Sequence, residues 1–266
     1  MHQLRFLLAA TLLTAPAFAQ ERAAPAPRIA DNSFLVEEAY NQEAGVIQHI
    51  GMFRHAADGG WVFTFTQEWP VFSQRHQLSY TVPVVSTEAG TGVGDIAINY
   101  RLQVLGREDE RVWFSPRLSA VLPTGDGGAA RGAGGPGVQV NLPLSIELTN
   151  TLVTHWNAGL NTTRARSPLG TRRSLRSLNA AASAIWLVAP TLNLMLESTW
   201  ERAESFDALE RTQTAERFVL MPGIRAAINL KSGMQIVPGI GVPFVRSAGP
   251  TDRDLVLYFS VEHSIR

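Results

Sequence analysis

The sequence predicts an all-β fold: an antiparallel transmembrane β-barrel of about 12 strands, preceded by an N-terminal periplasmic segment. Three observations predict it. Apolar and polar residues alternate in runs of about ten residues. The connections between the runs are alternately short and long, and aromatic residues lie near the ends of several runs. Each of these is a property of barrels that cross a lipid bilayer.

The alternation is clearest in "GDIAINYRLQVL". There Ile96, Ile98 and Tyr100 share one face of a strand, and Asn99 and Arg101 share the other. A spacing of two residues places side chains on the same face of a strand. Comparable runs, each expected to be a strand, lie near residues 46–55, 60–69, 73–84, 94–105, 110–122, 137–148, 151–161, 176–188, 191–202, 216–228, 233–244 and 253–264.

The connections favour a membrane barrel over other β folds. Very short links such as "TN" and "AP" alternate with longer ones such as "TGDGGAARGAGGPG" and "TTRARSPLGTRRSL". Outer-membrane barrels have tight periplasmic turns and long external loops. A soluble β-sandwich or periplasmic barrel is the alternative, but sandwich strands are typically ~5–6 residues long and their loops need not alternate in length.

The N-terminus predicts export. The stretch "MHQLRFLLAATLLTAPAFAQ" has an early cation, an apolar run and an Ala17-Phe18-Ala19 cleavage pattern, whereas a membrane anchor needs ~20 apolar residues. We expect a signal peptide at 1–19 cleaved after Ala19, a plug-like periplasmic segment at 20–45, and a barrel at 46–266 in the outer membrane of a Gram-negative bacterium. Basic and acidic residues are equal at 23 each, which gives no bias toward nucleic acid.

The face opposite the apolar one would line a lumen. Its charged residues have both signs. They would either pair in salt bridges across a narrow interior and hold the barrel together, or line a polar conduit, and the two roles are compatible. The expected lumen-lining residues are Glu68, Arg75, Asp95, Arg101, Arg117, Glu147, Glu197, Glu201, Arg217, Arg225 and Glu262. From the entry segment, Glu37, Glu38 and Glu43 would meet Arg75, Arg101 or Arg225.

No catalytic, cofactor-binding or metal-binding residue is predicted, and we expect neither a cofactor nor an enzymatic activity. The histidines lack a metal-binding spacing, and the glycine-rich "GDGGAARGAGGPG" lacks the GK[ST] of a phosphate-binding loop. One alternative is a barrel lipid hydrolase, because a hairpin would bring Ser145 near His155. Another is a barrel that binds ligands through long external loops and transports nothing.

Four stretches carry a resemblance to a known family: "DNSFLVEEAYNQEAGVIQHI", "GWVFTFTQEWPVF", "HQLSYTVPV" and "GVGDIAINYRLQV". Together they resemble the outer-membrane proteins grouped as the "MetA-pathway of phenol degradation" family, most strongly in residues 31–122. The resemblance implies an outer-membrane β-barrel transporter linked to uptake of aromatic or other small hydrophobic compounds. It brings no catalytic residues with it.

The expected function is therefore a monomeric channel or transporter for small molecules. The expected partners are outer-membrane lipids, lipopolysaccharide and the barrel-insertion machinery. Lipopolysaccharide is suggested by arginines clustered in one long connection, although a solvated loop is the alternative; these are Arg164, Arg166, Arg172, Arg173 and Arg176. The chain departs from most outer-membrane barrels in ending with Ile265-Arg266 instead of a terminal aromatic residue.

Overall fold

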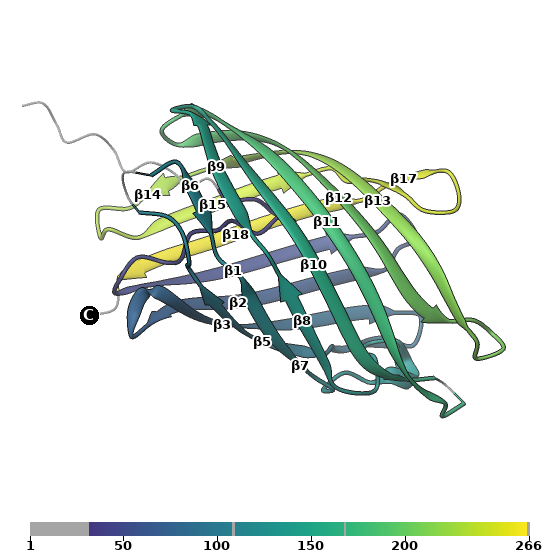
Figure 1. Ribbon diagram of the computed structural model, residues 1–266. Helices are drawn as coiled ribbons and strands as arrows, with labels where there is room; N and C mark the ends of the chain where they lie inside the picture. Colours follow the sequence, from purple (N-terminus) through teal and green to yellow (C-terminus); the bar gives the residue numbers. More distant parts are fainter. Residues whose placement is uncertain (1–31, 108–109, 168, 265–266) are drawn as a thin grey trace, which may run out of the picture.

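A computed structural model describes residues 32–107, 110–167 and 169–264, and within these ranges the chain forms a closed β-barrel (Figure 1). The signal peptide predicted at 1–19 lies outside the described residues. All strands join in one 18-stranded antiparallel sheet, which closes where the first strand pairs with the last. The strands are β1 (Val46–His55), β2 (Trp61–Val71), β3 (Ser73–Thr87), β4 (Gly90–Val93), β5 (Ile96–Leu102), β6 (Val112–Phe114), β7 (Arg117–Leu122), β8 (Gly137–Asn141), β9 (Leu144–Thr149), β10 (Leu152–Arg166), β11 (Arg172–Ala189), β12 (Leu192–Phe206), β13 (Thr212–Ala226), β14 (Ile228–Asn229), β15 (Gln235–Gly241), β16 (Phe244–Arg246), β17 (Thr251–Arg253) and β18 (Leu255–Ser264).

Several of these elements are halves of one spanning strand, so the barrel has 12 strands and the predicted number is confirmed. Proline explains three of the interruptions: Pro116, Pro143 and Pro243 follow β6, β8 and β15. Proline has no N–H to donate to the ladder. Its carbonyl still accepts, so Pro143 receives Ser115 N at 3.1 Å and Pro243 receives Asp254 N at 2.9 Å, and pairing continues across the breaks.

The outer wall of the barrel is apolar and the inner wall is polar. On β5, Ile98 and Tyr100 are 48% and 37% exposed, whereas Asn99 and Arg101 between them are 5% and 2% exposed. A surface of this kind is stable only against lipid, which confirms the predicted transmembrane β-barrel. None of the described residues forms a helix long and apolar enough to cross a membrane.

The two ends of the barrel differ in the length of their connections. At the end of the barrel where β18 finishes with Ser264, β2 and β3 are joined through Phe72 alone, β9 and β10 through Asn150–Thr151, and β11 and β12 through Pro190–Thr191 (Figure 1). Short turns are characteristic of the periplasmic side. We therefore refer to this end as periplasmic and to the opposite end as external.

Two of the predicted long external loops are mostly strand. β10 continues to Arg166 and β11 starts at Arg172, and their ladder pairs every residue up to the turn. β12 and β13 likewise stay paired from Leu192 to Phe206. Polar residues in these stretches hid the strands from the alternation pattern, because above the membrane both faces of a hairpin meet water and need no apolar side.

Candidate functional site

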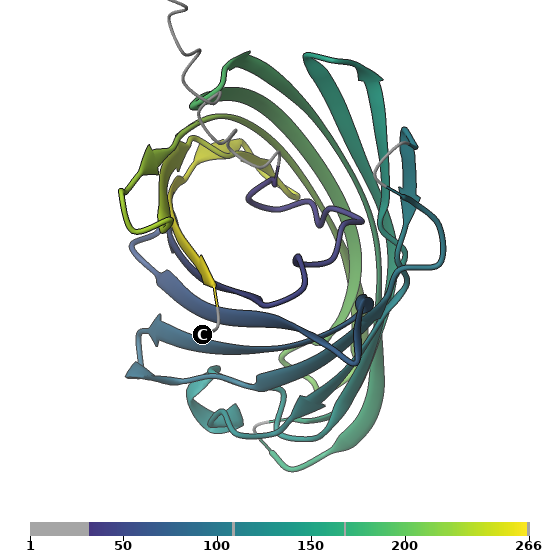
Figure 2. The same ribbon diagram turned by 90° about the vertical axis from the view of Figure 1, so that its left-hand side faces the viewer.

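Residues 32–43, called the plug segment below, lie inside the barrel (dark purple in Figure 2). They form no helix or strand, and Phe34, Val36 and Ala39 are buried. An extended chain without a strand partner exposes its backbone N–H groups, and each one buried without an acceptor would be costly. The walls of the lumen must therefore supply the acceptors.

Neutral side chains of the inner wall supply several of these acceptors. Each is an amide or hydroxyl oxygen on an inward-facing strand position or just beyond a strand end, and each receives one backbone N–H of the plug segment. The pairs are Glu37 N to Asn157 Oδ1 at 2.8 Å, Ala39 N to Ser145 Oγ at 2.8 Å, Asn41 N to Gln103 Oε1 at 3.1 Å, and Gln42 N to Gln77 Oε1 at 2.8 Å.

Glu197 on β12 binds the start of the plug segment. Its Oε1 accepts Phe34 N at 2.8 Å, and its Oε2 accepts Leu35 N at 2.7 Å and Val36 N at 3.0 Å. The carboxylate is fully buried. One acidic side chain thus satisfies three consecutive backbone donors.

Glu37 joins the plug segment to two arginines of the wall. Arg117 Nε donates to Oε2 at 2.8 Å, Arg101 Nη1 donates to Oε1 at 3.3 Å, and Asn141 Nδ2 donates to Oε2 at 2.7 Å. Burial raises the pKa of Glu37, but the guanidiniums of Arg117 and Arg101 outweigh it and lower the pKa below its usual value. Glu37 is therefore a carboxylate at neutral pH.

Besides Glu37, Arg101 on β5 contacts three residues of the plug segment: Glu38, Tyr40 and Asn41. It donates to Glu38 O at 2.9 Å, to Tyr40 O, and to Asn41 Oδ1 at 2.9 Å, and its Nη1 lies 3.8 Å from Glu38 Oε1. Its side chain is only 3% exposed. A buried arginine is stable only with most of its donors occupied, and the plug segment occupies them.

Phe34 fills a socket formed by glycines. A Cβ atom on Gly223 or Gly239 would lie 2.7 Å from the Phe34 ring, so neither position admits a side chain without displacing it. The ring packs in an apolar cluster of the lumen with Met221 and lies 5.1 Å from the ring of Tyr258. The lumen thus has an apolar patch on β12, β13, β15 and β18, opposite its arginine-rich wall on β5 and β7.

Gly239→Ala is expected to loosen the plug segment. The added methyl group overlaps the Phe34 ring, and overpacking of this kind costs about 1–3 kcal/mol. Backbone amides 34–36 should then exchange hydrogen for deuterium faster, as measured by mass spectrometry. Gly51→Ala is the matched control, because its Cβ would meet its nearest neighbour, Phe63, at 3.4 Å. Equal exchange in the two variants would contradict the socket.

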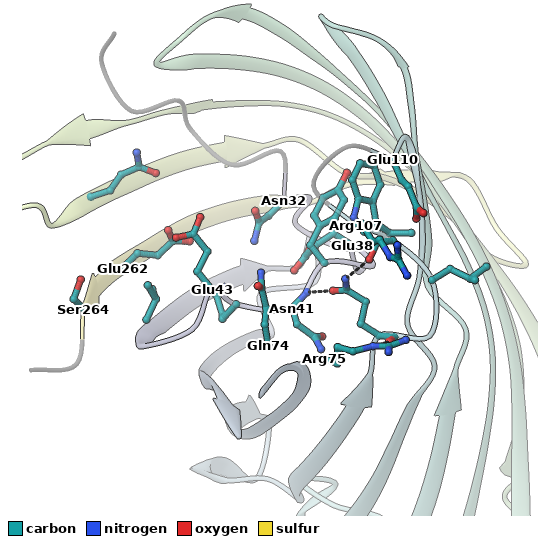
Figure 3. A pocket seen from close by; sticks show the side chains of 18 of the residues that line it. Asn32, Glu38, Asn41, Glu43, Gln74, Arg75, Arg107, Glu110, Glu262 and Ser264 are labelled. Atoms are coloured by element: carbon teal, nitrogen blue, oxygen red, sulfur yellow. Dashed lines mark hydrogen bonds between the residues drawn. The ribbon is translucent and has the colours of Figure 1, made fainter. Parts of the chain in front are cut away.

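A cavity of about 1000 Å³ lies between the plug segment and the periplasmic rim (Figure 3). Its lining includes Glu38, Glu43 and Glu262, together with Arg75 and Arg107. The cavity is therefore polar and carries both signs of charge. The plug segment forms part of its wall, so a solute that enters from the periplasmic end meets this segment first.

The structure brings part of the predicted charged set to the plug segment. Glu37, Glu38, Arg101, Arg117, Glu197 and Arg225 gather there, and Arg225 Nη1 donates to Asn32 O. Glu68 lies 4.0 Å from Arg101 and accepts from Gln77 Nε2 at 2.8 Å. Glu43 lines the cavity, and within the described ranges it forms no ion pair with an arginine.

Other predicted residues lie apart from the plug segment. Arg75 donates to the carbonyls of Gln103 and Val104 at the periplasmic rim. Asp95 accepts Gly125 N at 2.9 Å and Ala133 N at 2.7 Å, so it anchors the external loop at 123–136. Three more occupy inward positions elsewhere: Arg217, 3.8 Å from Asp254; Glu262, which accepts from Gln48 at 2.6 Å; and the half-buried Glu201. Glu147 on β9 is half-buried as well.

Ser145 and His155 come together, but in the lumen. Ser145 Oγ lies 2.7 Å from His155 Nδ1, both residues are fully buried, and Ser145 Oγ also accepts Ala39 N. A lipid hydrolase needs its nucleophile at the lipid surface. This pair faces the plug segment instead, where its hydrogen bonds have a structural role. Across the described residues, no group of three or more His, Asp or Glu side chains could hold a metal ion.

The closed sheet, the apolar exterior and the polar interior define a transmembrane β-barrel of the outer-membrane type. Solved structures share this fold. An outer membrane channel from Pseudomonas putida F1 aligns over 85% of this chain and 97% of its own, with a TM-score of 0.64 and 13% identity. The NanC porin aligns over 83% of this chain and 99% of its own, with a TM-score of 0.52 and 10% identity. No protein-family model and no curated protein matches the chain.

Proposed function

We propose that the protein is an outer-membrane channel for small molecules, exported by a signal peptide cleaved after Ala19 and gated by the plug segment. One observation carries the proposal: the plug segment is held in a polar lumen by hydrogen bonds, ion pairs and one aromatic side chain. Such contacts can break and re-form, whereas a lumen packed with wall side chains has nothing to release.

The shape and chemistry of the lumen support small and partly apolar solutes. Once the plug segment is displaced, the Phe34 socket would offer an apolar surface, and the arginine wall opposite would offer hydrogen-bond donors. Sites that combine an apolar surface with a few placed polar groups suit small organic molecules. The family resemblance, which implies uptake of aromatic or small hydrophobic compounds, agrees with this chemistry. The protein of the same fold from Pseudomonas putida F1 is an outer membrane channel, which supports the proposal of a channel.

A barrel that transports nothing is the second candidate. The favouring observation is that the plug segment is extensively hydrogen-bonded to the wall, from Ser33 to Gln42. A permanently closed barrel would use its external hairpins for binding. The two candidates differ in one measurable property, which is whether the folded protein ever becomes permeable.

The deciding experiment uses purified full-length protein in planar bilayers and in liposomes. A channel is expected to show current steps in the bilayer and solute-dependent liposome swelling, with mostly closed periods because the plug segment is in place. Folding and insertion are verified by heat-dependent migration in gels. Verified insertion without current or swelling at any applied voltage would refute the channel and leave the closed barrel.

A further inference from the structure

The outer face of the barrel carries five exposed arginines just above the apolar belt on the external side. They lie on three neighbouring strands, at alternate positions that continue the lipid-facing rows of Leu160, Leu178 and Trp200. The set, called the rim arginines below, is Arg164 and Arg166 on β10, Arg172 and Arg176 on β11, and Arg202 on β12. Because side chains alternate along a strand, all five face outward.

Arg173, which the sequence placed in the same cluster, does not belong to it. It pairs with the buried Ala165 and so lies on the other face of the hairpin. There it faces the turn acid Glu210, which accepts from the hydroxyls of Ser167 and Thr171. These two hydroxyls, with a smaller contribution from Arg173, lower the pKa of Glu210.

The rim arginines lack partners that would neutralise them. Within the described part of the chain, none of the five has an ion pair within 4.0 Å. Two acids share this face: Glu216 stands opposite Arg202 on β13, and Glu204 accepts the backbone N–H of Arg176 at 2.9 Å. Five positive charges therefore face two negative ones.

One pair of rim arginines is placed against the ordinary rules of sheet pairing. Arg166 and Arg172 are directly opposite each other in the ladder. Like charges at such positions destabilise a sheet. Two other arginines at this end do have acids beside them: Arg131 lies 3.2 Å from Asp126, and Arg211 lies 2.8 Å from Asp207. An anion bound between Arg166 and Arg172 would turn the repulsion into attraction.

We propose that the rim arginines bind the phosphate groups of lipopolysaccharide. The first reason is the position of the rim arginines along the barrel axis. They begin where the lipid-facing apolar rows of β10–β12 end, on the side away from the periplasmic turns. The second reason is chemical. Guanidinium groups bind phosphate oxygens through paired hydrogen bonds, and several of them close together bind a multiply phosphorylated headgroup more tightly than isolated charges do.

The binding test uses the full-length protein, folded in detergent, and two lipids: deep-rough lipopolysaccharide and the same lipid after enzymatic removal of its phosphates. EDTA is present so that divalent cations do not bridge lipid to acids. The triple variant Arg164→Gln, Arg166→Gln, Arg172→Gln is expected to bind the phosphorylated lipid roughly tenfold more weakly or worse, since each lost charged contact weakens binding. Wild-type protein should lose affinity to a similar degree for the dephosphorylated lipid.

Two control measurements test which arginines bind the lipid and whether the ligand is the lipid or free phosphate. Arg211→Gln, an arginine of the same end already paired with Asp207, should bind as the wild type does. Millimolar inorganic phosphate should not displace the lipid. The proposal is overturned by wild-type affinity in the triple variant, by equal binding of the dephosphorylated lipid, or by displacement with inorganic phosphate. Should the triple variant fail to fold, the comparison of the two lipids on wild-type protein decides alone.

Discussion

Deletion of residues 32–43 is expected to raise the conductance of the barrel several-fold and to make it stay open. The plug segment is the part of the described chain that lies in the lumen without belonging to the sheet (Figure 2). Its removal exposes the amides and hydroxyls that received its backbone donors, and all of these hydrate well in water. The barrel itself should persist, because β1 still pairs with β2 and β18.

A reversible lock provides the control for this deletion. Ser33 Oγ and Ser183 Oγ are 2.8 Å apart, and the chain has no cysteine of its own. In the variant Ser33→Cys, Ser183→Cys, a disulfide would tie the plug segment to β11, since the two side chains already meet there. The oxidised variant should show no openings, and reduction should restore wild-type current. Large conductance in the oxidised variant, or an unchanged current after deletion, would exclude the plug segment as the gate.

The barrel could be predicted from the sequence because the lipid imposes a period-two pattern on each spanning strand. Ile98 and Tyr100 had to face lipid, so Asn99 and Arg101 had to face inward, and both statements hold. The pattern failed where the lipid ends. Above the membrane, the strand ends near Arg166 and Arg172 show no apolar face, so they looked like loop although they are fully paired.

The contacts of the plug segment were harder to predict from the sequence than the barrel. Its acids suggested a contact with lumen arginines, and Glu37 does lie beside Arg101. Charge alone could not select Arg117 as the second partner, because partner choice depends on the register between strands. The neutral acceptors such as Asn157 carry no charge signal at all, and the Phe34 socket depends on glycines from two strands that meet only in the folded barrel.

Glu197→Gln is expected to release the start of the plug segment while leaving the rest in place. The carboxylate offers two acceptor oxygens to the N–H groups of Phe34, Leu35 and Val36. Glutamine offers one acceptor oxygen and an NH2 group, and the NH2 group is itself a donor, so it cannot accept a hydrogen bond from a backbone N–H. At least one buried donor is then unsatisfied, which costs about 1–3 kcal/mol and corresponds to roughly ten- to a hundredfold in an equilibrium.

That cost should appear as a higher open probability in single-channel records and as faster deuterium exchange at amides 34–36. Glu201→Gln is the matched control. Glu201 lies four residues further along β12 on the same inner face, and in the described chain no hydrogen bond or ion pair joins it to the plug segment. Both variants replace one inward-facing carboxyl group of β12 by an amide, so an effect that any such replacement has on current would appear in each. A selective effect of Glu197→Gln on openings would show that the closed state depends on the backbone donors that Glu197 holds, whereas equal behaviour would show that these hydrogen bonds do not keep the barrel closed.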